Sequence, residues 1–223
     1  MIKFSSAPQG SDAWMQIRSG RITGSKFKTA RERMKKTGEL SAKATLYARD
    51  VARERFGGKC ESVYQNHAMK FGTEQEPFAR QAYETTTGAL VQEAGFAYTD
   101  CGMYGLSVDG LIDDDGVLEI KTMVGSDNLF ETVVLEDYSD YMDQCLGYLL
   151  FLDRQWVDLC LWTPDLEDKG LGLVIHRINR ADHLDAIDAL RADLNGFAAI
   201  VKTYEARLRE KAAANVDMLR QAA

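Results

Sequence analysis

Cysteine and histidine are scarce in this chain, and neither forms a metal-binding motif. The four cysteines, at positions 60, 101, 145 and 160, include no C-x-x-C pair, which excludes a zinc ribbon and a locally ligated iron–sulfur cluster. We expect them to be reduced thiols, most of them buried. His67, His176 and His183 show no H-E-x-x-H or other ligand spacing, so histidine-based zinc chemistry is not expected.

Long apolar runs are also missing. No run approaches the roughly 20 residues that cross a bilayer, and the first residues lack the apolar core of a secretory signal. We therefore expect a cytoplasmic location and no membrane partner. The 223 residues are 45% hydrophobic and 27% charged, with only three prolines, which is the composition of an ordinary globular protein. This length predicts a single domain over residues 1–223.

The net charge of −7 hides a strong asymmetry. Residues 18–36 carry eight basic side chains against one acid, Glu32, so this stretch has a charge of +7 and the remainder −14. A basic patch on an acidic body is a candidate phosphate-binding surface. A solvated helix face is the alternative.

The apolar pattern predicts an α/β protein in which helices precede a small meandering sheet. In the fourth expected helix Pro77 is tolerable only near the first turn. The expected elements are helices at 11–20, 23–36, 41–56 and 73–87, strands at 89–100, 103–113 and 116–123, helices at 127–136 and 138–153, strands at 155–162 and 170–178, and a helix at 181–221.

An apolar stripe runs along the final helix at three- and four-residue steps. Such a stripe is more often intramolecular core than a partner surface, although a subunit interface stays open as the alternative. Its residues are Leu184, Ile187, Leu190, Leu194, Phe197, Val201, Tyr204 and Leu208.

The residues that carry chemistry gather in segment 105–121. Asp109 precedes a hairpin turn expected at 113–116, and Glu119, Ile120 and Lys121 follow on the returning strand. Because alternate side chains of a strand share a face, Glu119 and Lys121 project together. Ile120 then turns into the core and leaves its carbonyl at the strand edge, while Asp109 can reach the site from across the hairpin. The acids at 113–115 are interpreted as ordinary turn residues.

Two carboxylates and a carbonyl are hard oxygen ligands, which suit Mg²⁺ or Mn²⁺ better than zinc. A lysine beside them can orient an attacking water or neutralise charge on a phosphate. The group predicts metal-assisted phosphodiester hydrolysis, with surface acids of a hairpin as the alternative. An EF-hand is excluded because Leu111 and Thr122 stand where acids are required, and neither a G-x-S-x-G nor a P-loop motif is present.

Five segments resemble, in order and at similar separations, the phage lambda exonuclease or YqaJ-type viral recombinase family. This family belongs to the restriction-endonuclease-like, PD-(D/E)xK nucleases. The resemblance covers about residues 10–165 and implies a small mixed central sheet flanked by helices, followed here by the long C-terminal helix. The segments are DAWMQIRSGRITGSKF, FGTEQEPFARQAYE, GLSVDG, VLEIK and YMDQCLGYLLFL.

The resemblance assigns roles to single residues around the expected hairpin. Asp109 and Glu119 look like the metal-binding carboxylates, Ile120 like the carbonyl ligand and Lys121 like the catalytic lysine. Val108 stands where the family commonly has proline, which puts only the start of this strand in doubt.

Two further site residues are implied on helices. Glu76 resembles an additional acid of the catalytic and metal-binding set, and Gln144 resembles the late-helix glutamine that lines the site. The complete set implies two Mg²⁺ ions per site, for which Mn²⁺ is expected to substitute.

A DNA-end pocket is implied by three residues that fall where the family binds the 5′-terminal phosphate. Arg18, Ser25 and Ser107 supply a guanidinium and two hydroxyls, which suit an anion. Met69 resembles the apolar wedge that separates the terminal base pair, with a core position as the equal alternative. Trp14 is expected to be a packing residue, and residues 31–43 align too poorly to assign further contacts.

The resemblance implies a Mg²⁺-dependent 5′→3′ exonuclease that resects double-stranded DNA ends and leaves a 3′ strand for annealing recombination. It also implies a homotrimer that works with a single-strand annealing protein. Two alternatives stay open: a structure-specific or restriction-type endonuclease of the same fold, and a catalytically inactive adaptor that binds DNA ends. The complete set of Glu76, Asp109, Glu119 and Lys121 speaks against the adaptor.

Overall fold

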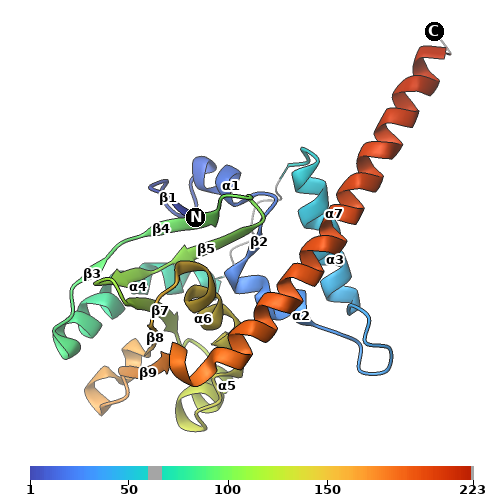
Figure 1. Ribbon diagram of the computed structural model, residues 1–223. Helices are drawn as coiled ribbons and strands as arrows, with labels where there is room; N and C mark the ends of the chain where they lie inside the picture. The colour runs from blue at the N-terminus through green and yellow to red at the C-terminus, as the bar shows by residue number, and fades with distance from the viewer. Residues whose placement is uncertain (60–66, 222–223) are drawn as a thin grey trace.

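The computed structural model describes residues 1–59 and 67–221 and confirms an α/β fold with a long C-terminal helix (Figure 1). The α-helices are α1 (Asp12–Arg18), α2 (Phe27–Arg31), α3 (Ala42–Arg55), α4 (His67–Thr87), α5 (Ser126–Asn128), α6 (Ser139–Leu152) and α7 (Leu184–Gln221). The strands are β1 (Ile2–Ser5), β2 (Ile22–Thr23), β3 (Val91–Gln92), β4 (Gly95–Thr99), β5 (Tyr104–Val108), β6 (Gly110–Ile112), β7 (Gly116–Thr122), β8 (Trp156–Trp162) and β9 (Leu173–Asn179).

The strands form two mixed sheets rather than a single meander. The first sheet has the order β1-β4-β5-β2 and the second β3-β6-β7-β8-β9. The β2–β5 and β7–β8 pairs are parallel, and the other pairs are antiparallel. The short strands β1 and β2 were not predicted, because neither has enough residues to show an alternating pattern.

Asp109 lies where the chain leaves the first sheet and enters the second. It is the single residue between β5, in the first sheet, and β6, in the second. The next residue must be small, because a Cβ atom on Gly110 would lie 2.2 Å from a side-chain carbon of Val91. The main chain therefore makes a sharp change of sheet at the residue that the sequence singles out.

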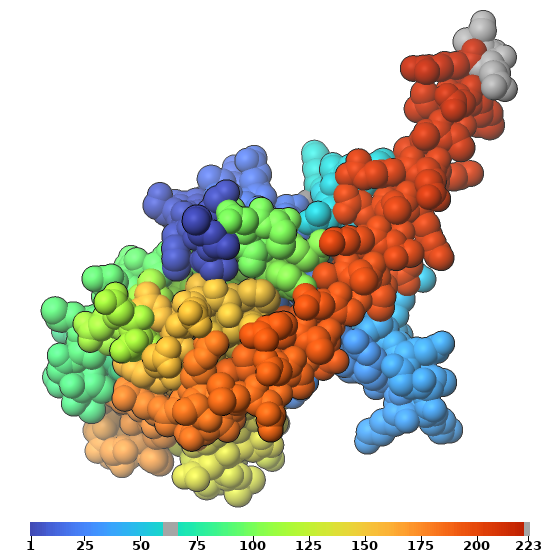
Figure 2. All heavy atoms as spheres, viewed as in Figure 1, coloured from blue at the N-terminus to red at the C-terminus, as the bar shows by residue number. Residues whose placement is uncertain are grey.

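The long helix α7 runs across the body of the protein alongside α3, and its C-terminal end projects beyond the rest of the chain (Figures 1 and 2). The middle of the predicted stripe is buried, and Phe197 stacks on Tyr47 of α3 at 5.5 Å between ring centroids. Leu184 and Leu208, at the ends of the stripe, are exposed. The stripe is therefore intramolecular core over its middle turns. No helix in the part of the chain described is both long and apolar enough to cross a bilayer.

Two helix boundaries differ from the prediction. Helix α4 is helical from His67, so Gly72 lies inside it and Pro77 lies well beyond the first turn. An interior glycine is tolerated when packing supplies the stability that propensity lacks. Helix α2 ends at Arg31, and the chain up to Ser41 forms a projecting loop closed by an Arg33–Leu40 bridge (Figure 1).

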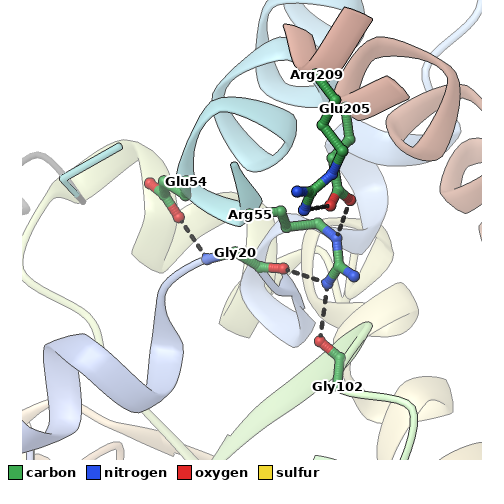
Figure 3. A network of polar contacts seen from close by, with 6 residues as sticks. All are labelled: Gly20, Glu54, Arg55, Gly102, Glu205 and Arg209. Atoms are coloured by element: carbon green, nitrogen blue, oxygen red, sulfur yellow. Dashed lines mark hydrogen bonds and ion pairs between the residues drawn. The ribbon is translucent and has the colours of Figure 1, made fainter. Parts of the chain in front are cut away.

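Arg55, the last residue of α3, joins three distant segments (Figure 3). Its Nε donates to Glu205 of α7 at 2.8 Å, and its Nη1 donates to the carbonyls of Gly20 and Gly102 at 3.1 and 3.2 Å. The adjacent Glu54 accepts a hydrogen bond from the Gly20 amide at 2.7 Å. The pair therefore fixes the turn after α1, which contains Gly20 in a left-handed conformation with φ of 70°.

We predict that Arg55→Ala lowers the free energy of unfolding by about 2–3 kcal/mol, because it leaves two backbone carbonyls and one oxygen of the Glu205 carboxylate without their donor. Arg209→Ala is the matched control, since Arg209 also binds Glu205, at 2.7 Å, but is mostly exposed. Its expected cost is below about 1 kcal/mol. Urea unfolding measures both values, and equal losses would contradict the role given to Arg55.

Candidate active site

Among the strands that the structure describes, the second half of β7 has a neighbour on one side only. Strand β8 pairs with β7 along its whole length, whereas β6 pairs only with Gly116–Leu118. Beyond that point, the Ile120 amide donates to the Asp109 carboxylate at 2.8 Å. Because the N–H and C=O of one strand residue point to the same edge, the Ile120 carbonyl also faces this open edge. The Ile120 carbonyl, which is the predicted metal ligand, therefore points away from β8 and takes no part in the β7–β8 hydrogen bonds.

Glu119 lies on the opposite face of β7 from the buried Ile120 side chain and is almost completely enclosed. Lys121 Nζ lies 2.5 Å from Glu119 Oε1, which confirms that both side chains share a face. Two residues of α6 complete the contacts of this carboxylate. Gln144 donates to Oε1 at 2.6 Å, and the Tyr148 hydroxyl forms a short hydrogen bond with Oε2.

Glu76 approaches from α4. Its Oε1 accepts a hydrogen bond from Arg80 Nη2 at 2.9 Å, one helical turn further on. The same nitrogen lies 3.3 Å from the main-chain oxygen of Asp109. Arg80 therefore contacts both the Glu76 side chain on α4 and the main chain of Asp109 between the two sheets.

One cavity of about 610 Å³ brings together every predicted site residue. The proposed roles stay predictions, but residues far apart in the sequence share one enclosed space. From the predicted set, the cavity is lined by Arg18, Ser25, Met69, Glu76, Ser107, Asp109, Glu119, Ile120, Lys121 and Gln144.

The three residues of the predicted phosphate pocket come from α1, the 3-10 turn Gly24–Lys26 and β5, and all of them line the cavity. Arg18 Nη2 donates to Thr23 at 3.3 Å, and its guanidinium lies 5.0 Å from the ring centroid of Trp14. Trp14 packs edge-on against Phe96, as expected, and also lines the cavity. Met69 is 46% exposed and faces the same space, so the alternative of a core position is wrong.

The basic stretch is only partly available to a ligand. Lys28 pairs with Asp140, and Arg31 binds Asp143 at 2.5 Å and Asp193 at 2.8 Å. These acids on α6 and α7 neutralise part of the charge of α2. Arg18 lines the cavity, whereas Lys28 and Arg31 bind acids, so the charges of this stretch are not all available to one ligand.

Negative charge is concentrated around Asp109. Burial, followed by the carboxylates of Glu119 and Glu76, raises the pKa of Asp109 well above its ordinary value. Burial also raises the pKa of Glu76, against the opposing effect of the Arg80 guanidinium. Burial alone would lower the pKa of Lys121, but Glu119 and Asp109 outweigh it and raise that pKa. The folded site thus disfavours the ionised forms of the Asp109 and Glu76 carboxyl groups.

The donor chemistry of the cavity fits a hard divalent cation. Carboxylate and carbonyl oxygens are the ligands that Mg²⁺ prefers, and excess negative charge in a buried site calls for a cation. Within residues 1–59 and 67–221, no three His, Cys, Asp or Glu side chains already form a ligand cluster. Glu119 is instead held by Lys121, Gln144 and Tyr148, so a cation at Glu119 would compete with the Lys121 ammonium for this carboxylate.

Sequence reasoning missed two residues that organise the site. Tyr148 lies one turn after Gln144 on α6, and its hydroxyl contacts Glu119, Gln144 and the Ser107 carbonyl. Arg80 lies one turn after Glu76 on α4. The four-residue spacing from an identified site residue was the available signal. The cysteine prediction holds for the buried Cys145 and Cys160, whereas Cys101 is exposed and Cys60 lies outside the described residues.

We predict that Asp109→Asn raises the apparent Tm in EDTA by about 2–4 °C, the shift that roughly 1 kcal/mol gives a chain of this size. Because the pKa of Asp109 is higher in the folded state than in the unfolded state, the free energy of unfolding falls as the pH rises from the unfolded-state pKa to the folded-state pKa. Asparagine does not ionise, so the variant avoids this loss. Asp158→Asn is the matched control. Asp158 is buried but compensated by Arg177 at 2.7 Å and Tyr83 at 2.5 Å, so its replacement should lower the Tm. A fall in both would contradict the charge analysis of Asp109.

Comparison with solved structures finds close likeness over nearly the whole chain. An alkaline exonuclease from Laribacter hongkongensis, LHK-Exo, is 29% identical, with a TM-score of 0.78 over 92% of this chain and 99% of its own. LHK-Exo in complex with dAMP gives 30% identity and a TM-score of 0.77 at the same coverage. A phage-related exonuclease from Haemophilus somnus 129PT, at 15% identity and a TM-score of 0.67 over 86% of this chain and 96% of its own, shares the fold.

A search of curated proteins gives no match. The model of the family described as the YqaJ-like viral recombinase domain matches residues 13–154, which is more than half of the chain and includes every predicted site residue. The chain therefore belongs to the YqaJ-like viral recombinase domain family and is homologous to alkaline exonucleases.

Proposed function

We propose that this protein is a Mg²⁺-dependent exonuclease that degrades linear double-stranded DNA from 5′ to 3′ and leaves a 3′ single strand for annealing recombination. The observation that carries the proposal is that one cavity is lined by Glu76, Asp109, Glu119 and Lys121 together with Arg18. Carboxylates beside a lysine suit phosphodiester hydrolysis, whereas an arginine with hydroxyls suits a terminal phosphate.

In this proposal the DNA end is held before it is cut. Arg18 donates to the 5′-terminal phosphate, with the hydroxyls of Ser25 and Ser107 as further donors. Ser107 and Asp109 are two residues apart, so an end held at Ser107 has its first phosphodiester near the carboxylates. Met69 is exposed at the first turn of α4 and packs against the terminal base pair.

The chemical step is assigned to the residues around β7. Asp109, Glu119, Glu76 and the Ile120 carbonyl would hold two Mg²⁺ ions, for which Mn²⁺ substitutes. When bound, these ions would activate the attacking water and stabilise charge on the leaving oxygen. Lys121, once it has left Glu119, orients the water and neutralises charge on the phosphate. Gln144 remains as a donor that fixes the Glu119 carboxylate.

Further support comes from what the relatives are. LHK-Exo is an alkaline exonuclease whose complex with dAMP is known, and a deoxynucleoside monophosphate is what an exonuclease of this kind releases from a DNA end. By the same homology we propose that the chain acts as a homotrimer together with a single-strand annealing protein. Each copy would then present one cavity to the duplex.

We predict that Lys121→Ala lowers the cleavage rate by about 100- to 1000-fold, the usual effect of removing one group that stabilises transition-state charge. Binding of a duplex end, measured by fluorescence anisotropy in Ca²⁺, should remain close to wild type. Lys169→Ala is the control, because Lys169 is exposed and pairs with its neighbour Asp168. Equal loss of binding and cleavage in Lys121→Ala would overturn the assigned role.

The direct test of the proposed function is digestion of linear duplex DNA in Mg²⁺. We expect faster loss of a strand with a 5′-phosphate than of one with a 5′-hydroxyl, and Arg18→Ala should reduce this preference. A closed circle should stay intact. A nicked circle would indicate the endonuclease alternative, and no cleavage with any divalent cation would indicate the DNA-end adaptor.

A further inference from the structure

Both terminal nitrogens of Arg80 make contacts beside the cavity, whereas its buried Nε has no hydrogen-bond partner among the described residues. Its side chain is 15% exposed and contacts three acceptors: Glu76 at 2.9 Å, the Asp109 carbonyl at 3.3 Å, and the carboxylate of Glu93. Two of these acceptors belong to residues that supply site carboxylates. They come from different elements, because Glu76 lies in α4 and Asp109 lies between β5 and β6.

The main chain around Glu76 gives this side chain less support than a regular helix would. The next residue, Pro77, lies within α4 and has no N–H to donate to the Thr73 carbonyl one turn earlier. Glu76 therefore sits in a turn that lacks one backbone hydrogen bond. A side-chain contact from the following turn is a physical means of holding its carboxylate in one position.

Arg80 does not face the proposed DNA-end cavity. It lines a neighbouring recess of about 610 Å³, which shares Thr73, Glu76 and Asp109 with the cavity. Both terminal nitrogens already bind carboxylates, and the recess also contains Glu93. These acids disfavour a phosphate at this position, so Arg80 does not act by binding DNA.

We propose that Arg80 is a positioning residue that sets the separation between the Glu76 carboxylate and the Asp109 segment, and thereby the affinity of the site for divalent cations. The planar guanidinium directs one nitrogen to both groups while the other is tethered to Glu93, a geometry that a lysine ammonium does not reproduce. This inference rests on the proposed function, since it concerns the cation site of that function.

The test is Arg80→Lys, which keeps the positive charge and removes the planar guanidinium with its two terminal nitrogens. Isothermal titration of Mn²⁺ without DNA should show about 10- to 100-fold weaker binding, the usual effect of losing a group that orients a metal ligand. Turnover at saturating Mn²⁺ should also fall, while KM for DNA ends changes by less than about twofold, because Arg80 makes no substrate contact.

Two variants control for general damage. Arg177→Lys makes the same change in another guanidinium–carboxylate pair, that of Arg177 with buried Asp158, whose two contacts are both 2.7 Å. Glu93→Gln removes the charge of the outer partner of Arg80, which is 78% exposed, but keeps a side-chain oxygen that can accept the same hydrogen bond. Both variants should bind Mn²⁺ as wild type does, and thermal melts in EDTA should show that all three are folded.

Each outcome of these measurements either supports or overturns the inference. Unchanged Mn²⁺ affinity in Arg80→Lys overturns the inference, as does an equal loss in Arg80→Lys and Arg177→Lys, which would reveal a general effect on folding. If wild-type protein neither binds Mn²⁺ nor cleaves DNA, the proposed function fails and the inference fails with it. If the wild-type protein cleaves DNA and Arg80→Lys binds Mn²⁺ with wild-type affinity, the inference fails but the proposed function stands.

Discussion

The crowding of buried negative charge around Asp109 is the constraint on which the rest of the structure depends. Burial and two neighbouring carboxylates raise the pKa of this residue, so the fold must hold groups together that repel one another. Directional contacts from three elements supply the restraint. Lys121 comes from β7, Gln144 and Tyr148 come from α6, and Arg80 comes from α4. The sheet core is needed to carry these groups, because no short peptide could hold them against their repulsion.

The sequence identified the hairpin residues because a strand has a period of two. Glu119 and Lys121 share a face in the structure, and Ile120 is buried between them, as that period requires. The resemblance added Glu76 and Gln144, which lie 33 residues before and 35 after Asp109 and have no local pattern in common with it. Tyr148 and Arg80 lie four residues after Gln144 and Glu76, a spacing that marks them as neighbours of these residues. Their contacts with Glu119 and the Asp109 carbonyl depend on how the helices pack on the sheets, which this spacing does not reveal.

The basic stretch shows a different limit of sequence reasoning. Charges counted along the chain do not reveal which of them meet an opposite charge after folding. Lys28 and Arg31 find carboxylates on α6 and α7, whereas Arg18 turns into the cavity. The beginning of α4 was misplaced for a related reason. Gly72 and Pro77 weaken the local tendency to form helix, but burial of Ala79 and Tyr83 against the second sheet maintains it.

The position of Asp109 between the two sheets has a consequence for the size of the product. Ser107 belongs to the first sheet and Asp109 leads into the second, so one extended segment of three residues joins the hydroxyl that would hold a strand end to the acid that would act on it. Two strand steps place the Cα atoms of these two residues roughly 6–7 Å apart. In the proposed function, a spacing carried by so short a segment would act as a molecular ruler and would suit an enzyme that shortens a strand by equal single steps.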